Sequence, residues 1–376
     1  MTEHPFLPLL RPRLPEAKAL MPYLERIDAN AFYTNFGPLN KQLLERLTQW
    51  QAHQFGREVF GVTTANATLA LELVLTDLNL PPKSRILLPA LTFVATATAI
   101  LRCGHIPVVC DVDPHSWLLT PETLPHDLDV ETLGAVIPVA AFGMPQDAQA
   151  WQQWHERTGI PVVVDAAASF GAQSSDRHIP VVISLHATKC LSTGEGGLVL
   201  TEDSEQALRL AQMTNFGIGP LVTAGASNAK MSEYHAAVGH AGFDVWPEVS
   251  LHRRALHAQY QHILQHHCGD KLIFQKDTGL WAPSTMVVEF AAHDVREIAE
   301  RICAQQGIQT RRWYQPLIHE HPAISGALTP YVLPAAQSLA QRLLGIPFHL
   351  DMQQSDMERV AKALQLALGQ TTLKSS

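Results

Sequence analysis

The sequence predicts an α/β protein: a mostly parallel central sheet with helices on both faces, plus a smaller α+β domain at the C-terminal end. Three observations predict this fold. Short apolar, β-branched runs recur along the first part of the chain, and several are continuous, as in strands buried on both faces. Helical stretches separate these runs. After about Trp246 the order changes to helices with few strands, which indicates a second domain.

The central sheet is predicted from six strand candidates. They are Ile86–Leu88, Ile106–Val109, Ala135–Val139, Ile160–Val164, Val181–Leu185 and Leu198–Leu200. Helical patterns lie between them at Ala65–Leu78, Ala95–Cys103, Asp147–Arg157 and Ser204–Thr214. Alternation of strands and helices favours a parallel sheet with helices on both faces.

The C-terminal part has a different pattern. A long helix is predicted over Ser250–His267, then a strand at Met286–Phe290, a helix at Asp294–Gln306, a short strand near Gln309, and helices at Ala335–Leu344 and Gln354–Leu368. No repeat or long linker interrupts the chain, so the two parts should pack closely. We expect a large domain over residues 1–248, with an N-terminal arm, and a small domain over 249–376.

Composition limits the kinds of partner. The chain has 376 residues, 46% of them hydrophobic, which is enough for a large core. A net charge of −8 argues against nucleic acid or an anionic membrane as a partner. The five cysteines have no regular spacing, so neither a disulfide framework nor a cysteine metal site is expected. The start of the sequence does not resemble a signal peptide, and we expect a cytoplasmic protein.

Two residues stand where chemistry is common in open α/β sheets, at the carboxyl ends of strands. Asp165 follows the apolar run ending at Val164, where it is either a helix cap or a buried carboxylate waiting for a cation. Lys189 lies between a predicted strand and the glycines Gly194, Gly196 and Gly197. It is either an ordinary surface lysine beside a turn or a functional amine.

Three further features have both a structural and a functional interpretation. The turn Thr63–Thr68 precedes a helix, so its backbone N–H groups could attract a phosphate, or Asn66 and Thr68 could simply cap the helix. Phe93 follows another strand and is either core or a cofactor contact. His262 and His266 have helical spacing but no third ligand, which favours a solvated helix face over a metal site.

Seven segments, in order along nearly the whole chain, resemble the DegT/DnrJ/EryC1/StrS sugar aminotransferases, which are pyridoxal-phosphate (PLP) enzymes of fold type I. The segments are Tyr33–Pro38, Asn66–Thr68, Pro89–Thr96, Asp165–Ala167, Ser184–Lys189 with Gly194–Gly197, Asn228–Glu233 and Trp313–His319. Each segment alone is a weak signal, but all of them in the family's order is a strong one.

The resemblance implies a catalytic pair. Lys189 would bind PLP covalently and then serve as the proton shuttle. Asp165 would pair with the pyridinium nitrogen and keep it protonated. A lysine near a cationic cofactor can have its pKa lowered enough to take up a proton near neutral pH.

The resemblance also implies a cofactor pocket. Phe93 would stack on the ring, while Ala67, Thr68 and the Ser184 hydroxyl would bind the phosphate. Asn228 would reach the phosphate bound by the neighbouring subunit, which implies a homodimer with shared active sites.

Substrate contacts follow less directly. The resemblance makes Lys230 and His319 candidates, but the sequence departs from the family pattern near both the ring and the substrate. Ala168 stands where glutamine is frequent, and Phe170 where histidine is common. Ala229 and Lys230 replace a Tyr-Arg pair, so the planar guanidinium fork is lost.

The function implied is transfer of an amino group from an amino acid, L-glutamate, to the keto group of a nucleotide-linked sugar, a dTDP-keto-6-deoxy sugar. The product would serve amino-sugar or cell-surface polysaccharide biosynthesis, such as lipopolysaccharide O-antigen. One alternative is a PLP-dependent sugar dehydratase, but relatives of that kind carry histidine where this chain has Lys189. The other is a non-catalytic regulatory or scaffold protein, which would be expected to lose Asp165, Lys189 or the phosphate turn. The sugar, its carbon (C3 or C4) and the nucleotide stay open.

Overall fold

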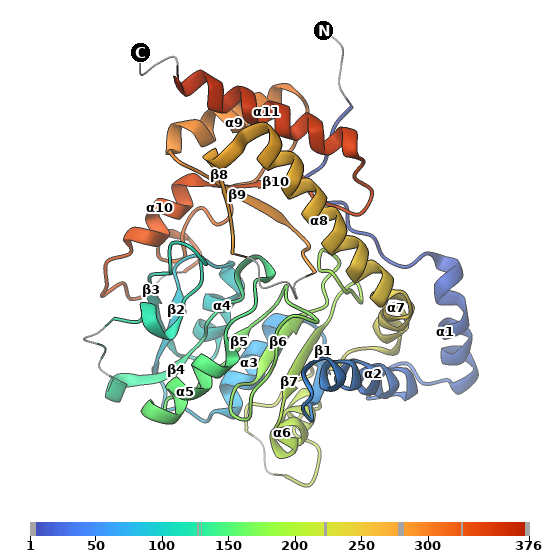
Figure 1. The fold of residues 1–376 in the computed structure, drawn as a ribbon. Helices are drawn as coiled ribbons and strands as arrows, with labels where there is room; N and C mark the ends of the chain where they lie inside the picture. Colours follow the sequence, from blue (N-terminus) through green and yellow to red (C-terminus); the bar gives the residue numbers. More distant parts are fainter. Residues whose placement is uncertain are drawn as a thin grey trace.

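The computed structural model describes residues 5–125, 128, 130–221, 224–276, 282–324 and 326–372. Two sheets, each with its own helices, lie one above the other in Figure 1. The larger sheet occupies the lower part of that view, and the smaller one lies above it beneath α9 (His293–Gln305) and α11 (Gln354–Thr372). No helix among the described residues is both long and apolar enough to span a membrane.

The large sheet has seven strands in the order β3-β2-β4-β5-β6-β7-β1. In chain order they are β1 (Phe60–Thr64), β2 (Arg85–Pro89), β3 (Ile106–Cys110), β4 (Leu133–Val136), β5 (Val164–Asp165), β6 (Val181–Ser184) and β7 (Gly197–Thr201). Parallel bridges from Val136 to Val162 and from Val139 to Asp165 join β4 to β5. Only β7 runs antiparallel to its neighbours, so the predicted mostly parallel sheet is confirmed.

Successive residues of the inner strands enter two separate hydrophobic cores. Ile86 and Leu88 lie in one core, and Leu87 between them lies in the other. A strand buried on both faces needs apolar residues at every position, which explains the continuous runs in the sequence.

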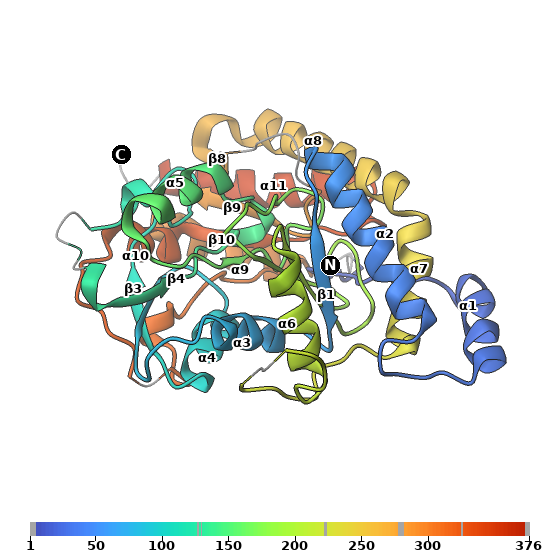
Figure 2. The ribbon, with the colours of Figure 1, turned by 90° about the horizontal axis from the view of Figure 1, so that it is seen from below.

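Helices cover both faces of this sheet, as predicted (Figure 2). On one face lie α3 (Ala67–Asp77), α4 (Val94–Arg102) and α6 (Ser204–Thr214). On the other lie α2 (Pro38–Phe55), α5 (Ala148–Thr158) and α7 (Glu233–Asp244), with α1 (Ala17–Asn30) packed on α7.

The small sheet is antiparallel, in the order β10-β9-β8. Its strands are β8 (Leu272–Phe274), β9 (Met286–Phe290) and β10 (Leu343–Ile346). Three helices enclose a third core with it: α8 (Trp246–Cys268), α9 (His293–Gln305) and α11 (Gln354–Thr372). The remaining helix, α10 (Pro334–Arg342), packs into a core of the large sheet, and Asp111 accepts hydrogen bonds from the Ala335 and Ala336 amides at its start.

Several predicted elements need correction. No strand forms at Gln309; its amide donates to the Leu7 carbonyl beside a single bridge between Leu7 and Ile308. The predicted helix Ala335–Leu344 ends at Arg342, because Leu343 and Leu344 pair with β9 as an edge strand. The turn predicted over Thr63–Thr68 begins only after Thr64, because Thr63 and Thr64 are the last two residues of strand β1.

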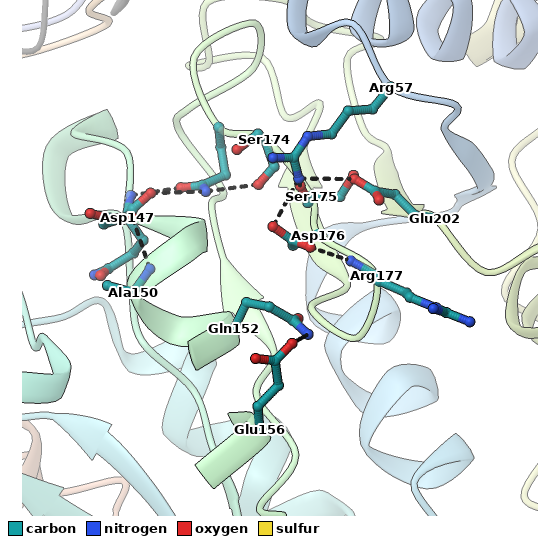
Figure 3. Close-up of polar contacts among 12 residues, drawn as sticks. Arg57, Asp147, Ala150, Gln152, Glu156, Ser174, Ser175, Asp176, Arg177 and Glu202 are labelled. Carbon is teal, nitrogen blue, oxygen red and sulfur yellow. Dashed lines mark hydrogen bonds and ion pairs between the residues drawn. The ribbon is translucent and has the colours of Figure 1, made fainter. Parts of the chain in front are cut away.

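Ion pairs connect segments at the end of the sheet where strands β1 and β6 begin. Nη1 of Arg57 lies 2.8 Å from Oδ2 of Asp176 and 3.5 Å from Oε1 of Glu202 (Figure 3). These contacts connect the end of α2 to the turn before β6 and to the residue after β7. Asp165 and Ser184 lie at the opposite end of the sheet, where β5 and β6 end.

Candidate active site

Asp165 is the last residue of β5, and its carboxylate is buried, with only 5% of the residue exposed. The Thr96 hydroxyl donates a hydrogen bond to Oδ2 at 2.7 Å, and the Ala167 amide donates to Oδ1 at 3.2 Å. Two donors on different oxygens fix the orientation of the carboxyl plane. Burial raises the pKa of Asp165, while these hydrogen bonds and the charge of Lys189 oppose the rise.

Lys189 lies in the loop between β6 and β7, where its backbone amide donates to the His186 carbonyl. Burial lowers the pKa of the Lys189 ammonium, and the nearby negative charge of Asp165 opposes that shift. The structure therefore places the two predicted catalytic groups close enough for the charge of each to shift the pKa of the other. A lysine with a lowered pKa offers more neutral amine near neutral pH, as a nucleophile or base requires.

This pair fits the chemistry of PLP. A carboxylate whose pKa is raised by burial gains most from a cation placed against it. The protonated ring nitrogen of the cofactor would be such a cation, and the Lys189 side chain offers an amine to which the cofactor aldehyde could attach.

A candidate phosphate cradle lies at the start of α3. The Asn66 side chain caps this helix by accepting from the Leu69 amide at 2.9 Å. The amides of Ala67 and Thr68 occupy the first turn, where N–H groups have no partner within the helix. Such N–H groups and the helix dipole favour an anion.

Gly197 lets this cradle approach Ser184. A Cβ at Gly197 would lie 2.7 Å from the backbone of Asn66 and 2.3 Å from Oγ1 of Thr64, so any side chain there would push α3 away. Gly197 is also the cross-strand partner of Ser184. The predicted phosphate ligands Ala67, Thr68 and Ser184 are thus gathered at one place in the fold.

Aromatic rings border the site. Phe93, the residue before α4, is 55% exposed and lies 6.5 Å, between ring centroids, from Tyr314. Tyr314 in turn stacks on Phe142 at 5.2 Å. Burial and the negative charge of Asp165 raise the pKa of Tyr314, so its hydroxyl stays protonated through the physiological range.

Asn228 and Lys230 form a small cluster of their own. Nζ of Lys230 donates to Oδ1 of Asn228 at 2.6 Å and lies 4.6 Å from the centroid of the exposed Phe216 ring. Between them, the Ala229 carbonyl accepts from the Ala65 amide at 2.7 Å, just before the phosphate cradle of the same chain. Within the described part of the chain, no hydrogen bond or ion pair joins Lys230 to Asp165 or Lys189.

His319 lies near the end of strand β2. The amide of its neighbour Ile318 donates to the Ala90 carbonyl just after β2. Nε2 of His319 is 3.8 Å from Oε1 of Glu320, and Nδ1 is buried without a hydrogen-bond partner in the described structure.

Two site residues had no role in the sequence analysis. Thr96 and Tyr314 both lie inside segments that carried the resemblance, but the hydrogen bond of Thr96 to Asp165 and the effect of the Asp165 charge on the pKa of Tyr314 depend on the tertiary fold. Helical spacing is a signal for Thr96, which follows Phe93 by one turn of α4. One departure is explained: Phe170 is a core residue, with its ring 5.1 Å from that of Trp246.

Comparison with known proteins gives the same assignment for nearly the whole chain. The model of the DegT/DnrJ/EryC1/StrS aminotransferase family matches residues 16–365. The dTDP-4-amino-4,6-dideoxy-D-glucose transaminase of Escherichia coli is 28% identical over 371 residues, covering 95% of this chain and 98% of the relative.

Solved structures agree. DesI, determined in the presence of its TDP-sugar product, is 28% identical with a TM-score of 0.86, covering 98% of this chain and 95% of that one. The aminotransferase TlmJ from Streptoalloteichus hindustanus is 25% identical with a TM-score of 0.84, covering 97% and 100%.

Proposed function

The chain belongs to the DegT/DnrJ/EryC1/StrS aminotransferase family and is a PLP-dependent nucleotide-sugar aminotransferase; from that premise we propose that it transfers the amino group of L-glutamate to the keto group of a dTDP-linked 4-keto-6-deoxy sugar. The observation that carries the proposal is the pair formed by buried Asp165 and half-buried Lys189, together with the candidate phosphate cradle at the start of α3. The E. coli relative is named for a dTDP-linked 4-amino sugar, which favours C4 over C3.

PLP, when bound, supplies an electron-accepting ring that stabilises negative charge at the carbon bearing the amino group. We propose that Asp165 holds the proton of the ring nitrogen, with Thr96 fixing the carboxylate through the 2.7 Å hydrogen bond. Lys189 would hold the cofactor and then move a proton to and from the reacting carbon, a role supported by its lowered pKa.

The other site residues are proposed to bind and orient. The amides of Ala67 and Thr68, with the Ser184 hydroxyl, would hold the cofactor phosphate. Phe93 would cover a ring face. Asn228 and Lys230 would act on the site of the partner subunit, and His319 on the sugar.

The setting of the reaction is part of the same proposal. We expect a cytoplasmic homodimer with a large domain over 1–248 and a small one over 249–376. Its amino sugar would enter a cell-surface polysaccharide such as lipopolysaccharide O-antigen.

The test is direct amino transfer. Purified protein loaded with PLP would be incubated with nitrogen-labelled L-glutamate and dTDP-4-keto-6-deoxyglucose, and the nucleotide sugar analysed by mass spectrometry. We expect labelled dTDP-4-amino-4,6-dideoxyglucose. A dehydrated sugar without label would assign dehydratase chemistry instead, and an unchanged sugar with every keto-sugar nucleotide tested would contradict the proposal.

A further inference from the structure

A cavity of about 610 Å³ lies next to the lysine loop, and we call it the Arg253 cavity. Five parts of the chain line it: the N-terminal arm between Arg13 and Ala19, the loop 189–192, the end of α7, the start of α8, and the residue Leu350. Its volume is in the range of small-molecule sites. It shares Lys189 with the candidate active site, but its lining includes neither Asp165 nor any of the proposed phosphate ligands.

The walls of the Arg253 cavity are mainly apolar. They include Leu14, Leu191, Val245, Trp246 and Val249. Such walls favour a ligand with a hydrocarbon body over a small, fully hydrated ion.

One buried cation lies in these apolar walls. Arg253 on α8 is only 9% exposed, and its Nη1 donates to the Pro283 carbonyl at 3.3 Å. Its Nε is buried without a hydrogen-bond partner, and no carboxylate among the described residues forms an ion pair with it. A buried charge without a counter-ion is strongly destabilising, so an anion is the missing partner.

Charged side chains that line the cavity also favour an anion. Arg13 and Lys18 line the cavity as cations, against the single carboxylate of Glu16. Arg13 is also 3.3 Å from Asp351, which leaves part of its guanidinium free for other acceptors.

We propose that the Arg253 cavity binds a small organic carboxylate, whose carboxylate group pairs with the Arg253 guanidinium and whose hydrocarbon body lies against Trp246 and Val249. A guanidinium presents donors in a planar fork that matches a carboxylate. Arg253 and Cys190, the neighbour of Lys189, both line this cavity, so the bound anion lies beside the loop that carries the proposed catalytic amine.

The experiment measures binding rather than catalysis, so it is independent of the proposed reaction. The PLP-loaded protein is titrated by calorimetry with 4-methylpentanoate, 2-oxoglutarate and inorganic phosphate. Arg253→Met should weaken carboxylate binding on the order of a hundredfold, because a buried charge pair is lost. The matched control Arg254→Met changes the next residue of α8, which is not part of the lining, and should keep the parent affinity.

Thermal unfolding without ligand separates a binding role from a structural one. Arg253→Met should unfold at the parent temperature or higher, since it removes a buried unpaired charge. Binding of 4-methylpentanoate supports a general carboxylate site, and binding of 2-oxoglutarate alone assigns the anion to the keto acid of the proposed donor. Failure of both carboxylates to bind, or binding unchanged in Arg253→Met, would overturn the proposal.

Discussion

At the residue scale, burial changes the acid–base properties of Asp165 and Lys189. Burial raises the pKa of Asp165 and lowers that of Lys189, and each charge partly restores the other. The charged form of each group therefore loses part of the stabilisation that water would give it, and a cation placed against Asp165 would restore that stabilisation. This environment suits a cationic cofactor ring.

Thr96 offers a test of that interpretation as a positioning residue. Thr96→Val removes the 2.7 Å hydrogen bond to Asp165 and keeps the side-chain shape, so the pKa of Asp165 should rise further. We expect amino transfer to fall roughly ten- to a hundredfold, as for loss of a hydrogen bond to a charged group. The acid limb of the pH–rate profile should also move to higher pH, which a purely structural role would not cause.

Thr98→Val is the control for this substitution. Thr98 lies two residues further along α4, and its hydroxyl donates to the Val94 carbonyl of its own helix. It should keep both the rate and the pH profile of the parent. A Thr96→Val enzyme with the parent's profile would show that this hydrogen bond does not tune Asp165.

The proposed catalytic pair came from the resemblance to the family, because position alone left a structural alternative open both for Asp165 at a strand end and for Lys189 in the loop after β6. Thr96, Tyr314 and Arg253 were not assigned roles, since each acts through a partner far along the chain. Thr96 meets Asp165 across 69 residues, and Arg253 meets the Pro283 carbonyl across 30. The roles of the individual cofactor and substrate residues remain predictions.

At the element scale, one carboxylate joins two segments that resembled the family. Glu233, only 1% exposed at the start of α7, accepts from the amides of Leu39 and Asn40 at 2.8 and 2.7 Å. Those amides belong to the first turn of α2, which has no side-chain cap of its own. The Glu233 amide also donates to the Tyr33 carbonyl. The segment Asn228–Glu233 therefore sets where the segment Tyr33–Pro38 begins its helix.

Glu233→Gln should be costly for stability. The variant keeps one acceptor but leaves the other buried amide of α2 facing a donor, so we expect a loss of about 1.5–3 kcal/mol in the free energy of unfolding. The measurement is a urea titration. The control is Glu45→Gln, at an exposed site on α2, which should change stability by less than about 0.5 kcal/mol. Equal stability of the two variants would contradict the proposed cap.

His240 anchors the same pair of helices and should make their packing sensitive to pH. Its Nε2 donates to the Leu39 carbonyl at 2.9 Å, so Nδ1, at 2.9 Å from Nη1 of Arg46, is an acceptor in the neutral ring. Burial lowers the pKa of His240, and the charge of Arg46 adds to that effect. Protonation would place a donor against a guanidinium.

The lowered pKa of His240 determines how the stability of the fold should depend on pH. The unfolded chain binds the proton at its ordinary pKa of about 6.5 and the folded chain only at lower pH, so stability is lost as pH falls below that value. His240→Gln, which can still donate to Leu39 and accept from Arg46, should lose less in melting temperature between about pH 7.5 and about pH 5.5. His262→Gln, at an exposed site on α8, should behave as the parent. A parent-like decline in His240→Gln would refute this role.

Element prediction succeeded where strands are buried on both faces and failed at edges and boundaries. The inner strands β2 and β6 have continuous apolar runs and were predicted. The edge strand β1, with the sequence FGVTT, was partly assigned to a turn because it is small and hydroxyl-rich. β10 follows α10 without a loop, so the sequence contains no boundary signal there.

At the scale of the whole molecule, the chain is organised around three hydrophobic cores. Two lie on the faces of the large sheet and one lies under α8, α9 and α11 (Figure 1). The helix α8 runs from Trp246 to Cys268 and so contains the predicted division at 248. The N-terminal residue Leu7 lies in the core of the small sheet. The division into 1–248 and 249–376 stays a prediction.

The shared active site of a homodimer can be tested by complementation. Lys189→Ala lacks the proposed catalytic amine, and Asn228→Ala lacks the group proposed to act on the partner's site. Alone, each variant should be nearly inactive. Mixed dimers should regain activity, because one of their two sites then has Lys189 from one subunit and Asn228 from the other.

The control for complementation is a mixture of Lys189→Ala with Asp165→Asn, two changes proposed to act in the same subunit's site. Neither site of that dimer is complete if Asp165 and Lys189 serve one site together with the partner's Asn228. No recovery in the first mixture, with mixed dimers shown to form, would indicate that Asn228 does not act across the interface.

The attachment point of the cofactor tests the central claim most directly. Borohydride reduction of the PLP-loaded protein fixes the cofactor on the lysine that holds it, and proteolysis with mass spectrometry then locates the modified peptide. We predict a single modified lysine, Lys189, and no modification in Lys189→Ala. A stable adduct on another lysine, such as Lys230, with Lys189 unmodified, would contradict the assignment of this site.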